Sequence, residues 1–435
     1  MAQKHFLLAL AIATGFLAVP AAAQLLPRGS GLVPNLIPTV AGTLHNTTGL
    51  LNNTLHNTVS IVRDTAGRPA NSRLFENDSN GARVVRGEVL SLSPTEQSLA
   101  IARARDFAVV RQESLDALGL EIAVLRAPSG MSTPEAVALL QRADPAGRYD
   151  YNHIYNPSGE GRGGPANEMT PATSSAALRI GMIDGGIDRS HPALRHVQIE
   201  TAVIVGDSHA PATAHGTAVA SLLVGQASNF HGALANATLY AADVYGGVAT
   251  GGSADDIARA LAWLANKGVP VSNISLAGPP NMILAAAVAA FVKSGHVLVA
   301  AVGNDGPAAP ERYPAAYAGV VGVTSVDAHR AVQIDANRGG DVAFAARGVD
   351  VRAAGLEGSY ASLTGTSYAA PLVAARFALL MPRPDPAAVA RAWVSLKAAS
   401  IDLGAPGRDA VFGYGYLDPP NTLPVVANST PTASR

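Results

Sequence analysis

A run of nine residues, Leu-Arg-Ile-Gly-Met-Ile-Asp-Gly-Gly at positions 178–186, decides the fold. Residues 178–183 are almost entirely apolar, which predicts a strand buried on both faces, and Asp184 ends it. Similar short runs follow at residues 238–244, 269–274, 296–302 and 319–323, separated by helical stretches that include residues 253–266 and 282–294. Buried strands that alternate with helices predict an α/β domain over residues 170–420, a parallel sheet with helices on both faces.

Functional side chains of such a sheet lie where strands end and helices begin. Asp184 ends the first strand, His215 opens His-Gly-Thr-Ala-Val-Ala-Ser before an apolar helix, and Ser367 lies in Gly-Thr-Ser-Tyr-Ala-Ala-Pro at a helix start. Each residue alone has an ordinary structural explanation, a helix cap for Asp184 or Ser367 and a buried imidazole for His215. Together they supply the carboxylate, imidazole and hydroxyl of nucleophilic catalysis. We therefore predict that these three residues form a catalytic triad.

A fourth residue fits the same chemistry. Asn304 follows the strand at residues 298–302, in Val-Gly-Asn-Asp-Gly-Pro. Its amide can donate to the oxyanion of a tetrahedral intermediate, and the backbone N–H of Ser367, at a helix start, is the expected second donor.

The order Asp, His, Ser and the segments around these residues resemble the subtilisin-like (subtilase) serine peptidases. Segments similar to those of the family occur in order at residues 215–220, 251–253, 275–278, 301–304, 313–315, 365–371 and 414–417. The resemblance covers residues 170–420 and implies a three-layer subtilisin-like domain that hydrolyses peptide bonds without a required cofactor. It also implies that substrate binds as an extended strand between two edges, one with Gly251, Gly252 and Ser253, the other with Ser275, Leu276, Ala277 and Gly278.

The resemblance places the side-chain pocket near Ala301 and Gly303, with Arg312 at its floor. Pointing inward, Arg312 would shorten the pocket or favour an acidic substrate side chain. Pointing outward and paired with Glu311, it would leave an apolar pocket. The cost of burying an unpaired guanidinium favours the apolar alternative.

Four residues depart from the family pattern. Gly185 stands where a Ser or Thr usually follows the Asp, Ala218 and Leu372 replace the second His of each signature, and Tyr368 replaces the Met after the nucleophile. None of these changes removes a catalytic atom, although the bulk of Tyr368 predicts different packing behind the nucleophile.

Residues 81–155 read as β-α-β-β-α-β, the order of a small ferredoxin-like α+β domain. This unit resembles the family's propeptide, a folding chaperone and intramolecular inhibitor removed by self-cleavage. Residues 156–169 form a predicted linker with the maturation site, for which Tyr155–Asn156 is the preferred bond because a loop follows a strand there.

The N-terminus predicts export. Residues 1–23 have a basic start, a short apolar run and an Ala-Ala-Ala cleavage site, which indicates a signal peptide rather than an uncleaved anchor. Residues 24–80, rich in Asn, Thr, Gly and Pro, predict a low-complexity linker, and residues 421–435 a flexible tail. A secreted or periplasmic protein with no membrane span after signal removal is expected.

The amino-acid composition excludes several other classes of protein function. The 435 residues include 31 Lys and Arg against 32 Asp and Glu, so there is no excess of positive charge to bind nucleic acid. The absence of Cys excludes thiol chemistry and disulfides. The family often carries calcium, but no dense cluster of Asp, Asn and Glu has calcium-ligand spacing. Calcium is therefore left open as an unsupported alternative, and no metal site is predicted. An esterase of the α/β-hydrolase type would need the opposite chain order of Ser and His. The alternative left open is a catalytically silent binding protein with the same fold.

Overall fold

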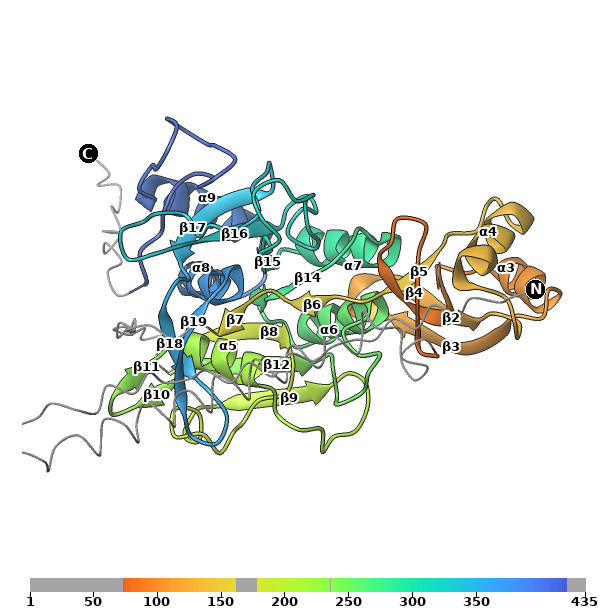
Figure 1. The fold of residues 1–435 in the computed structure, drawn as a ribbon, viewed down its shortest axis with the longest axis horizontal. Coiled ribbons are helices and arrows are strands. Elements are labelled where there is room, and N and C mark those ends of the chain that lie inside the picture. The colour runs from red at the N-terminus through yellow and green to blue at the C-terminus, as the bar shows by residue number, and fades with distance from the viewer. Residues whose placement is uncertain (1–72, 162–177, 235, 421–435) are drawn as a thin grey trace, which may run out of the picture. The chain divides into compact units, whose positions relative to one another are not determined.

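In the residues that the computed structural model describes (73–161, 178–234 and 236–420), a seven-stranded parallel sheet forms the centre of the C-terminal domain (Figure 1). Its strands, in spatial order, are β17 (Val342–Arg347), β16 (Val321–Val326), β15 (Val297–Ala301), β13 (Val271–Ile274), β8 (Arg179–Asp184), β12 (Thr238–Asp243) and β9 (Ile199–Val203). Five of these seven strands coincide with the apolar runs that the sequence shows. The other two, β9 and β17, form the edges.

Helices cover both faces of this sheet. On one face lie α5 (Ala214–Val224), α8 (Thr366–Leu380) and α9 (Pro386–Ala399), and on the other lie α6 (Ala254–Asn266) and α7 (Met282–Lys293). Neighbouring residues of β8 contribute to opposite cores, Met182 to the first and Ile183 to the second. The predicted three-layer α/β domain is therefore confirmed.

Local sequence explains where the helices begin. Ser253 caps α6 and forms a reciprocal capping box with Asp256. Gly365 precedes α8 with φ at 157°, so the backbone is nearly extended just before the helix that carries Ser367. Smaller pairs of strands complete this domain: β10 (Gln226–Ala227) with β11 (Phe230–His231), and β18 (Val351–Ala354) with β19 (Tyr360–Thr364).

Upstream lies an α+β unit with the predicted β-α-β-β-α-β order. Its elements are β2 (Arg83–Leu92), α3 (Glu96–Arg103), β3 (Ala108–Leu115), β4 (Leu120–Arg126), α4 (Thr133–Ala143) and β5 (Tyr149–His153), with a short helix η1 (Asp116–Leu118) between β3 and β4. The strands are antiparallel in the order β3-β4-β2-β5. An additional strand, β1 (Phe75–Asn77), pairs with β2. The predicted linker at residues 24–80 is thus too long at its C-terminal end, because Phe75–Asn77 belongs to this sheet.

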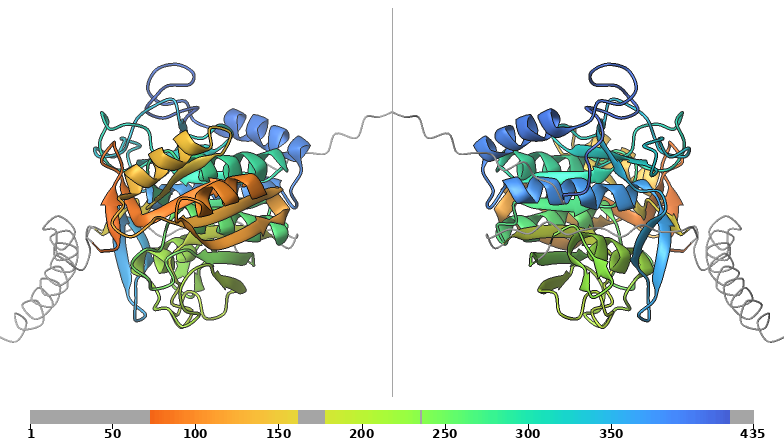
Figure 2. Two further views of the ribbon diagram at one scale, coloured as in Figure 1. Left: turned by 90° about the vertical axis from the view of Figure 1, so that its right-hand side faces the viewer. Right: turned by 90° about the vertical axis from the view of Figure 1, so that its left-hand side faces the viewer.

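The two faces of the small sheet have different partners. One face packs against α3 and α4, which are turned toward the viewer in the left panel of Figure 2. On the other face, Leu90, Leu92, Ile122 and Val124 join the hydrophobic cluster of α6 and α7. The buried apolar surface therefore runs continuously from the α+β unit into the C-terminal domain.

The predicted signal peptide at residues 1–23, nearly all of the linker at residues 24–80, the stretch 162–169 and the tail at residues 421–435 lie outside the described residues. Among the helices that are described, none has the length and apolar character that crossing a membrane requires. The same residues contain no group of three or more His, Cys, Asp or Glu side chains placed to hold a metal ion.

Candidate active site

Asp184 and His215 form a buried pair. Asp184 is the last residue of β8 and His215 the second of α5, so the end of a strand and the start of a helix bring them together. His215 Nδ1 lies 2.9 Å from Asp184 Oδ1, and the two side chains are 12% and 1% exposed. A carboxylate at Nδ1 fixes the tautomer that leaves Nε2 free to accept a proton.

Ser367 lies at the start of α8 and is completely buried. Its hydroxyl donates to the carbonyl of Ser275 at 3.1 Å. His215 Nε2 is buried without a hydrogen-bond partner among the described residues. The hydrogen bond that the predicted triad requires between Ser367 and His215 is therefore absent; such bonds are often long or poorly aligned when no substrate is bound.

The donors predicted for the oxyanion converge on one carbonyl of the chain itself. Asn304 Nδ2 donates to the carbonyl oxygen of Ser158 at 2.6 Å, and the backbone N–H of Ser367 donates to the same oxygen at 3.1 Å. An amide and a backbone N–H that meet on one carbonyl have the geometry of an oxyanion hole. Ser158 lies just after the α+β unit, so the chain occupies its own candidate site.

Two further residues hold the Asn304 amide in place. Its Oδ1 accepts hydrogen bonds from Gln333 Nε2 and from the backbone N–H of Thr366, each at 3.1 Å. With its oxygen satisfied on that side, the amide directs its nitrogen toward Ser158. Sequence analysis missed Gln333, because a single Gln in a loop, 29 positions from its partner, has no local pattern that reveals it.

The residues before Ser158 pair with both predicted substrate edges. β6 (Asn156–Pro157) is antiparallel to β14 (Leu276–Ala277), and the N–H of Ser158 donates to Ser275 at 3.2 Å. On the other side, the N–H of Tyr155 donates to the Gly252 carbonyl at 2.8 Å, and Ile154 forms a bridge with Ser253. This is β-augmentation, in which an extended peptide adds a strand to an exposed edge.

Tyr155 fills a pocket beside these edges and is completely buried. Its hydroxyl donates to the Pro279 carbonyl at 2.7 Å, while its own carbonyl accepts from the Tyr245 hydroxyl at 2.9 Å. A Cβ atom at Gly278 would lie 2.5 Å from the Tyr155 ring, so only glycine leaves room for it. Burial raises the pKa of both tyrosines well above the usual range, which keeps both hydroxyls protonated as donors.

The remaining predicted residues make no hydrogen bond to residues 154–158 within the described structure. Gly251 lies in the turn before Gly252, Ala301 ends β15, and Gly303 lies beside the Arg312 side chain. Arg312 pairs with Asp305 rather than with Glu311, at 2.8 Å between Nε and Oδ2, and its side chain is 31% exposed. The guanidinium is thus outward and neutralised, although by a different partner from the one considered in the sequence.

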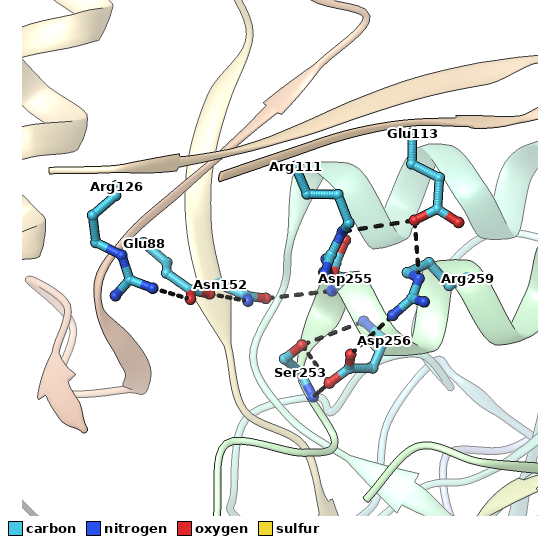
Figure 3. Close-up of polar contacts among 9 residues, drawn as sticks. All are labelled: Glu88, Arg111, Glu113, Arg126, Asn152, Ser253, Asp255, Asp256 and Arg259. Carbon is cyan, nitrogen blue, oxygen red and sulfur yellow. Dashed lines mark hydrogen bonds and ion pairs between the residues drawn. The ribbon is translucent and has the colours of Figure 1, made fainter. Parts of the chain in front are cut away.

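Charged groups also join the α+β unit to α6 (Figure 3). Arg111 of β3 pairs with Asp255 in the first turn of α6, and Glu113 of the same strand pairs with Arg259 at 3.1 Å. Asn152 accepts from the backbone N–H of Asp255 at 3.3 Å. Because the side chain of Asp255 is only 3% exposed, Arg111 balances a charge that is otherwise buried.

A three-layer α/β domain with Asp, His, Asn and Ser at these positions defines the class of proteins with a subtilisin-like fold. Residues 175–415, more than half of the chain, match the family model described as the Subtilase family. The chain belongs to the subtilase family, as the resemblance predicts.

Curated relatives are proteases of the same family. The chain is 32% identical over 245 residues to the minor extracellular protease Epr of Bacillus subtilis, a match that covers 55% of this chain and 37% of Epr. It is 31% identical over 235 residues to subtilisin DY of Bacillus licheniformis, covering 53% of this chain and 85% of that one.

Among solved structures, fervidolysin from Fervidobacterium pennivorans is similar with a TM-score of 0.66 and 18% identity, over 80% of this chain and 62% of that one. At this identity the likeness concerns the fold. The chain therefore matches little more than a third of Epr and less than two thirds of fervidolysin.

Proposed function

We propose that this protein is a serine endopeptidase that is made as a precursor and cleaves itself between Ser158 and Gly159. The observation that carries the proposal is the Ser158 carbonyl, which accepts hydrogen bonds from Asn304 Nδ2 and from the Ser367 N–H. These donors stabilise the oxygen that becomes negatively charged when the carbonyl is attacked.

The reaction follows from the roles of the four side chains. Ser367 Oγ attacks the Ser158 carbonyl carbon while His215 takes the hydroxyl proton, and Asp184 stabilises the resulting imidazolium. The tetrahedral intermediate collapses with loss of the Gly159 amine, to which His215 returns the proton. Water then releases the acyl group from Ser367 by the same steps. Other peptides would bind along the same two edges and be cleaved in the same way.

This bond replaces the one that the sequence favours. In the Tyr155–Asn156 bond, the carbonyl of Tyr155 accepts from the Tyr245 hydroxyl and lies at Gly252, away from Asn304. Tyr155 supports binding by filling a pocket three residues before the Ser158 carbonyl. The α+β unit would act as an inhibitor until cleavage, because its C-terminal extension occupies the substrate edges.

The test compares the full chain with its Ser367→Ala variant after expression. Wild type should split and yield a chain that begins at Gly159, while the variant remains uncleaved. N-terminal sequencing and intact mass settle the position. Cleavage of the Ser367→Ala chain at the same bond, or an intact wild-type chain, would overturn the proposal.

The alternative is a silent binding protein with the same fold. A serine-directed phosphonate distinguishes the two, because it labels Ser367 only where His215 activates the hydroxyl. Labelling of the processed wild type at one equivalent supports the peptidase. No labelling, together with an unprocessed chain, favours the binding protein.

Secretion is part of the same proposal. Residues 1–23 have the features of a signal peptide, and Epr is named as an extracellular protease. The uncleaved Ser367→Ala chain, recovered outside the cytoplasm of a bacterial host, should begin at Gln24. A chain that retains Met1 and sediments with the membrane would favour the uncleaved anchor.

A further inference from the structure

Gly159, the residue after the Ser158 carbonyl, lies directly against the ring of Tyr368. A Cβ atom built at Gly159 would lie 2.8 Å from Cε2, 3.0 Å from Cζ and 3.1 Å from the hydroxyl oxygen of Tyr368. The first of these distances is shorter than the close-packed separation of carbon atoms by about 1 Å. The backbone of Gly159 is not in the left-handed region, so its conformation alone does not require glycine. The ring is what excludes a side chain.

The Tyr368 ring is buried and packed against other apolar side chains. It is 3% exposed and packs in a cluster with Ala218, Leu222, Val351 and Ala353. Side chains in such a cluster do not move without opening a void or straining their neighbours. The ring therefore cannot retreat cheaply from a bulkier residue at position 159.

Two departures from the family pattern meet in this cluster. Tyr368 stands where the family usually has Met, and Ala218 stands where it usually has the second His of the His215 segment. The two residues pack in the same cluster, so the small side chain at position 218 leaves space that the large ring occupies. The centroid of the Tyr368 ring also lies 5.7 Å from that of the His215 ring, at an interplanar angle of 45°.

From this arrangement we propose that Tyr368 is a specificity residue that selects glycine immediately after the cleaved bond. The inference rests on the proposed function, because it takes Ser158–Gly159 as the cleaved bond. The preferred substrates would be peptides in which glycine follows the cleaved bond and supplies the leaving amine. Alanine or serine at that position would press a Cβ into the ring, while glycine passes beside it and receives its proton from His215.

A pair of peptides tests the selection on the processed wild-type enzyme. Both carry Tyr-Asn-Pro-Ser before the bond, one followed by Gly-Glu-Gly and the other by Ala-Glu-Gly, with a fluorophore and a quencher at the ends. Overpacking a buried contact by one methyl group costs enough to slow the reaction about 10- to 100-fold. We therefore expect kcat/KM for the glycine peptide to exceed that for the alanine peptide by about tenfold or more. Mass spectrometry of the products confirms that both are cut after Ser.

Two variants assign the effect to the ring. Tyr368→Phe keeps the ring edge that faces Gly159 and should retain the preference for glycine. Tyr368→Met replaces the ring with a flexible chain and should bring the ratio to within about threefold of one. Each active fraction is titrated with the phosphonate, so that incomplete folding does not change the ratio. If Tyr368→Met fails to fold, the wild-type and Tyr368→Phe ratios for glycine, alanine and valine peptides still decide.

The outcomes separate the two proposals. Equal cleavage of the glycine and alanine peptides by wild type, or an unchanged ratio in a folded Tyr368→Met enzyme, overturns the selection and leaves the peptidase intact. Failure of wild type to cleave either peptide, or to process itself, overturns the proposed function instead. In the full chain, Gly159→Ala should slow self-cleavage about tenfold or more, and Tyr368→Met should restore it.

Discussion

At the scale of single residues, Asn304 shows how a polar side chain becomes fixed before any reaction. Its oxygen accepts from Gln333 and from the Thr366 N–H, so its nitrogen is aimed at the Ser158 carbonyl without rotation. Such a donor needs no reorganisation when negative charge develops on the carbonyl oxygen.

We expect Asn304→Ala to lower kcat about 10²- to 10³-fold, because one of the two donors to the oxyanion is lost. KM for a Tyr-Asn-Pro-Ser-Gly peptide should change little, since the substrate edges remain. Gln333→Ala should have a smaller effect in the same direction, because the amide is retained but loses one of its two supports. Steady-state kinetics on phosphonate-titrated enzyme measures both variants, and a KM effect larger than the kcat effect would contradict the assignment.

A second residue-scale prediction concerns the pair Asp305 and Arg312. The ion pair neutralises the guanidinium, so an acidic side chain at the position of Ser158 should gain nothing in the wild-type enzyme. In Asp305→Ala the charge of Arg312 is uncompensated, and we expect acidic residues there to improve kcat/KM about two- to fivefold, the scale of a half-exposed pair. Arg312→Ala should shift the preference the opposite way. A peptide library varied at this one position measures both, and equal shifts in the two variants would disprove the electrostatic account.

At the scale of elements, β3 and α6 meet through the Arg111–Asp255 ion pair (Figure 3). Arg111→Ala leaves the Asp255 carboxylate buried without its partner, which should weaken the contact by about 1–3 kcal/mol, since Arg111 itself is 38% exposed. The processed enzyme should then escape inhibition sooner, and the lag before peptide hydrolysis should shorten. Arg103→Ala is the matched control, because Arg103 is an exposed residue in the last turn of α3. Equal lags in the two variants would contradict a role for the ion pair.

The stability of the protein should also depend on pH through Asp256, which lies next to Asp255 in the first turn of α6. Burial, followed by the charge of Asp255, raises the pKa of Asp256 from 3.8 to about 7, and hydrogen bonds from Ser253 and the charge of Arg259 act the other way. Arg111 and Tyr245 also interact electrostatically with this carboxyl. The folded state therefore holds a proton here that the unfolded state has lost between about pH 4 and pH 7.

The stabilisation that protonated Asp256 contributes is fully present below the pKa of this carboxyl in the unfolded chain. It is lost as the pH rises through the pKa in the folded chain, about 7. Asp256→Asn removes the titrating carboxyl and keeps an oxygen that can accept from Ser253. Between pH 5 and pH 8, we expect the unfolding free energy of the Asp256→Asn chain to rise relative to that of the Asp256 chain by at most about 3 kcal/mol, both in the Ser367→Ala background. Denaturant unfolding at several pH values measures the difference. Parallel curves for the two chains would show that Asp256 does not titrate in this range.

How far these elements can be predicted depends on whether the information is local. Asp184, His215, Ser367 and Asn304 lie in short segments whose neighbours specify a strand end or a helix start, so their places in the fold can be predicted from the sequence. The edge strand β9 is missed because only Ile199 of its five residues is buried, and the strand lacks the apolar run that identifies the interior strands. Which carbonyl reaches Asn304 depends on the register of β6 against β14, which no local pattern encodes. From the sequence, Tyr155 is the residue expected before the cleaved bond. The pocket that Gly278 leaves for the Tyr155 ring is visible only in the structure.

At the scale of the whole molecule, one segment of the chain occupies the candidate active site of the same chain. Residues 154–158 pair with both substrate edges, and the following strand β7 (Glu160–Gly161) pairs with β19 beyond the Ser158 carbonyl. A second chain cannot enter the site while this segment remains in place. Under the proposed function, the first cleavage of each precursor is therefore expected to be intramolecular.

We expect the initial rate at which chains beginning at Gly159 appear to be first order and independent of protein concentration over about a 100-fold range, because the reacting groups are already adjacent. The measurement follows purified precursor after release from denaturant, limited to the first tenth of the reaction so that processed enzyme contributes little. Precursor carrying Ser367→Ala, added in equal amount and marked by a mass tag, should remain uncut during this phase. Early cutting of the tagged chain, or a rate that rises in proportion to concentration, would mean that one precursor cleaves another and that the segment at residues 154–158 leaves the site before any bond is broken.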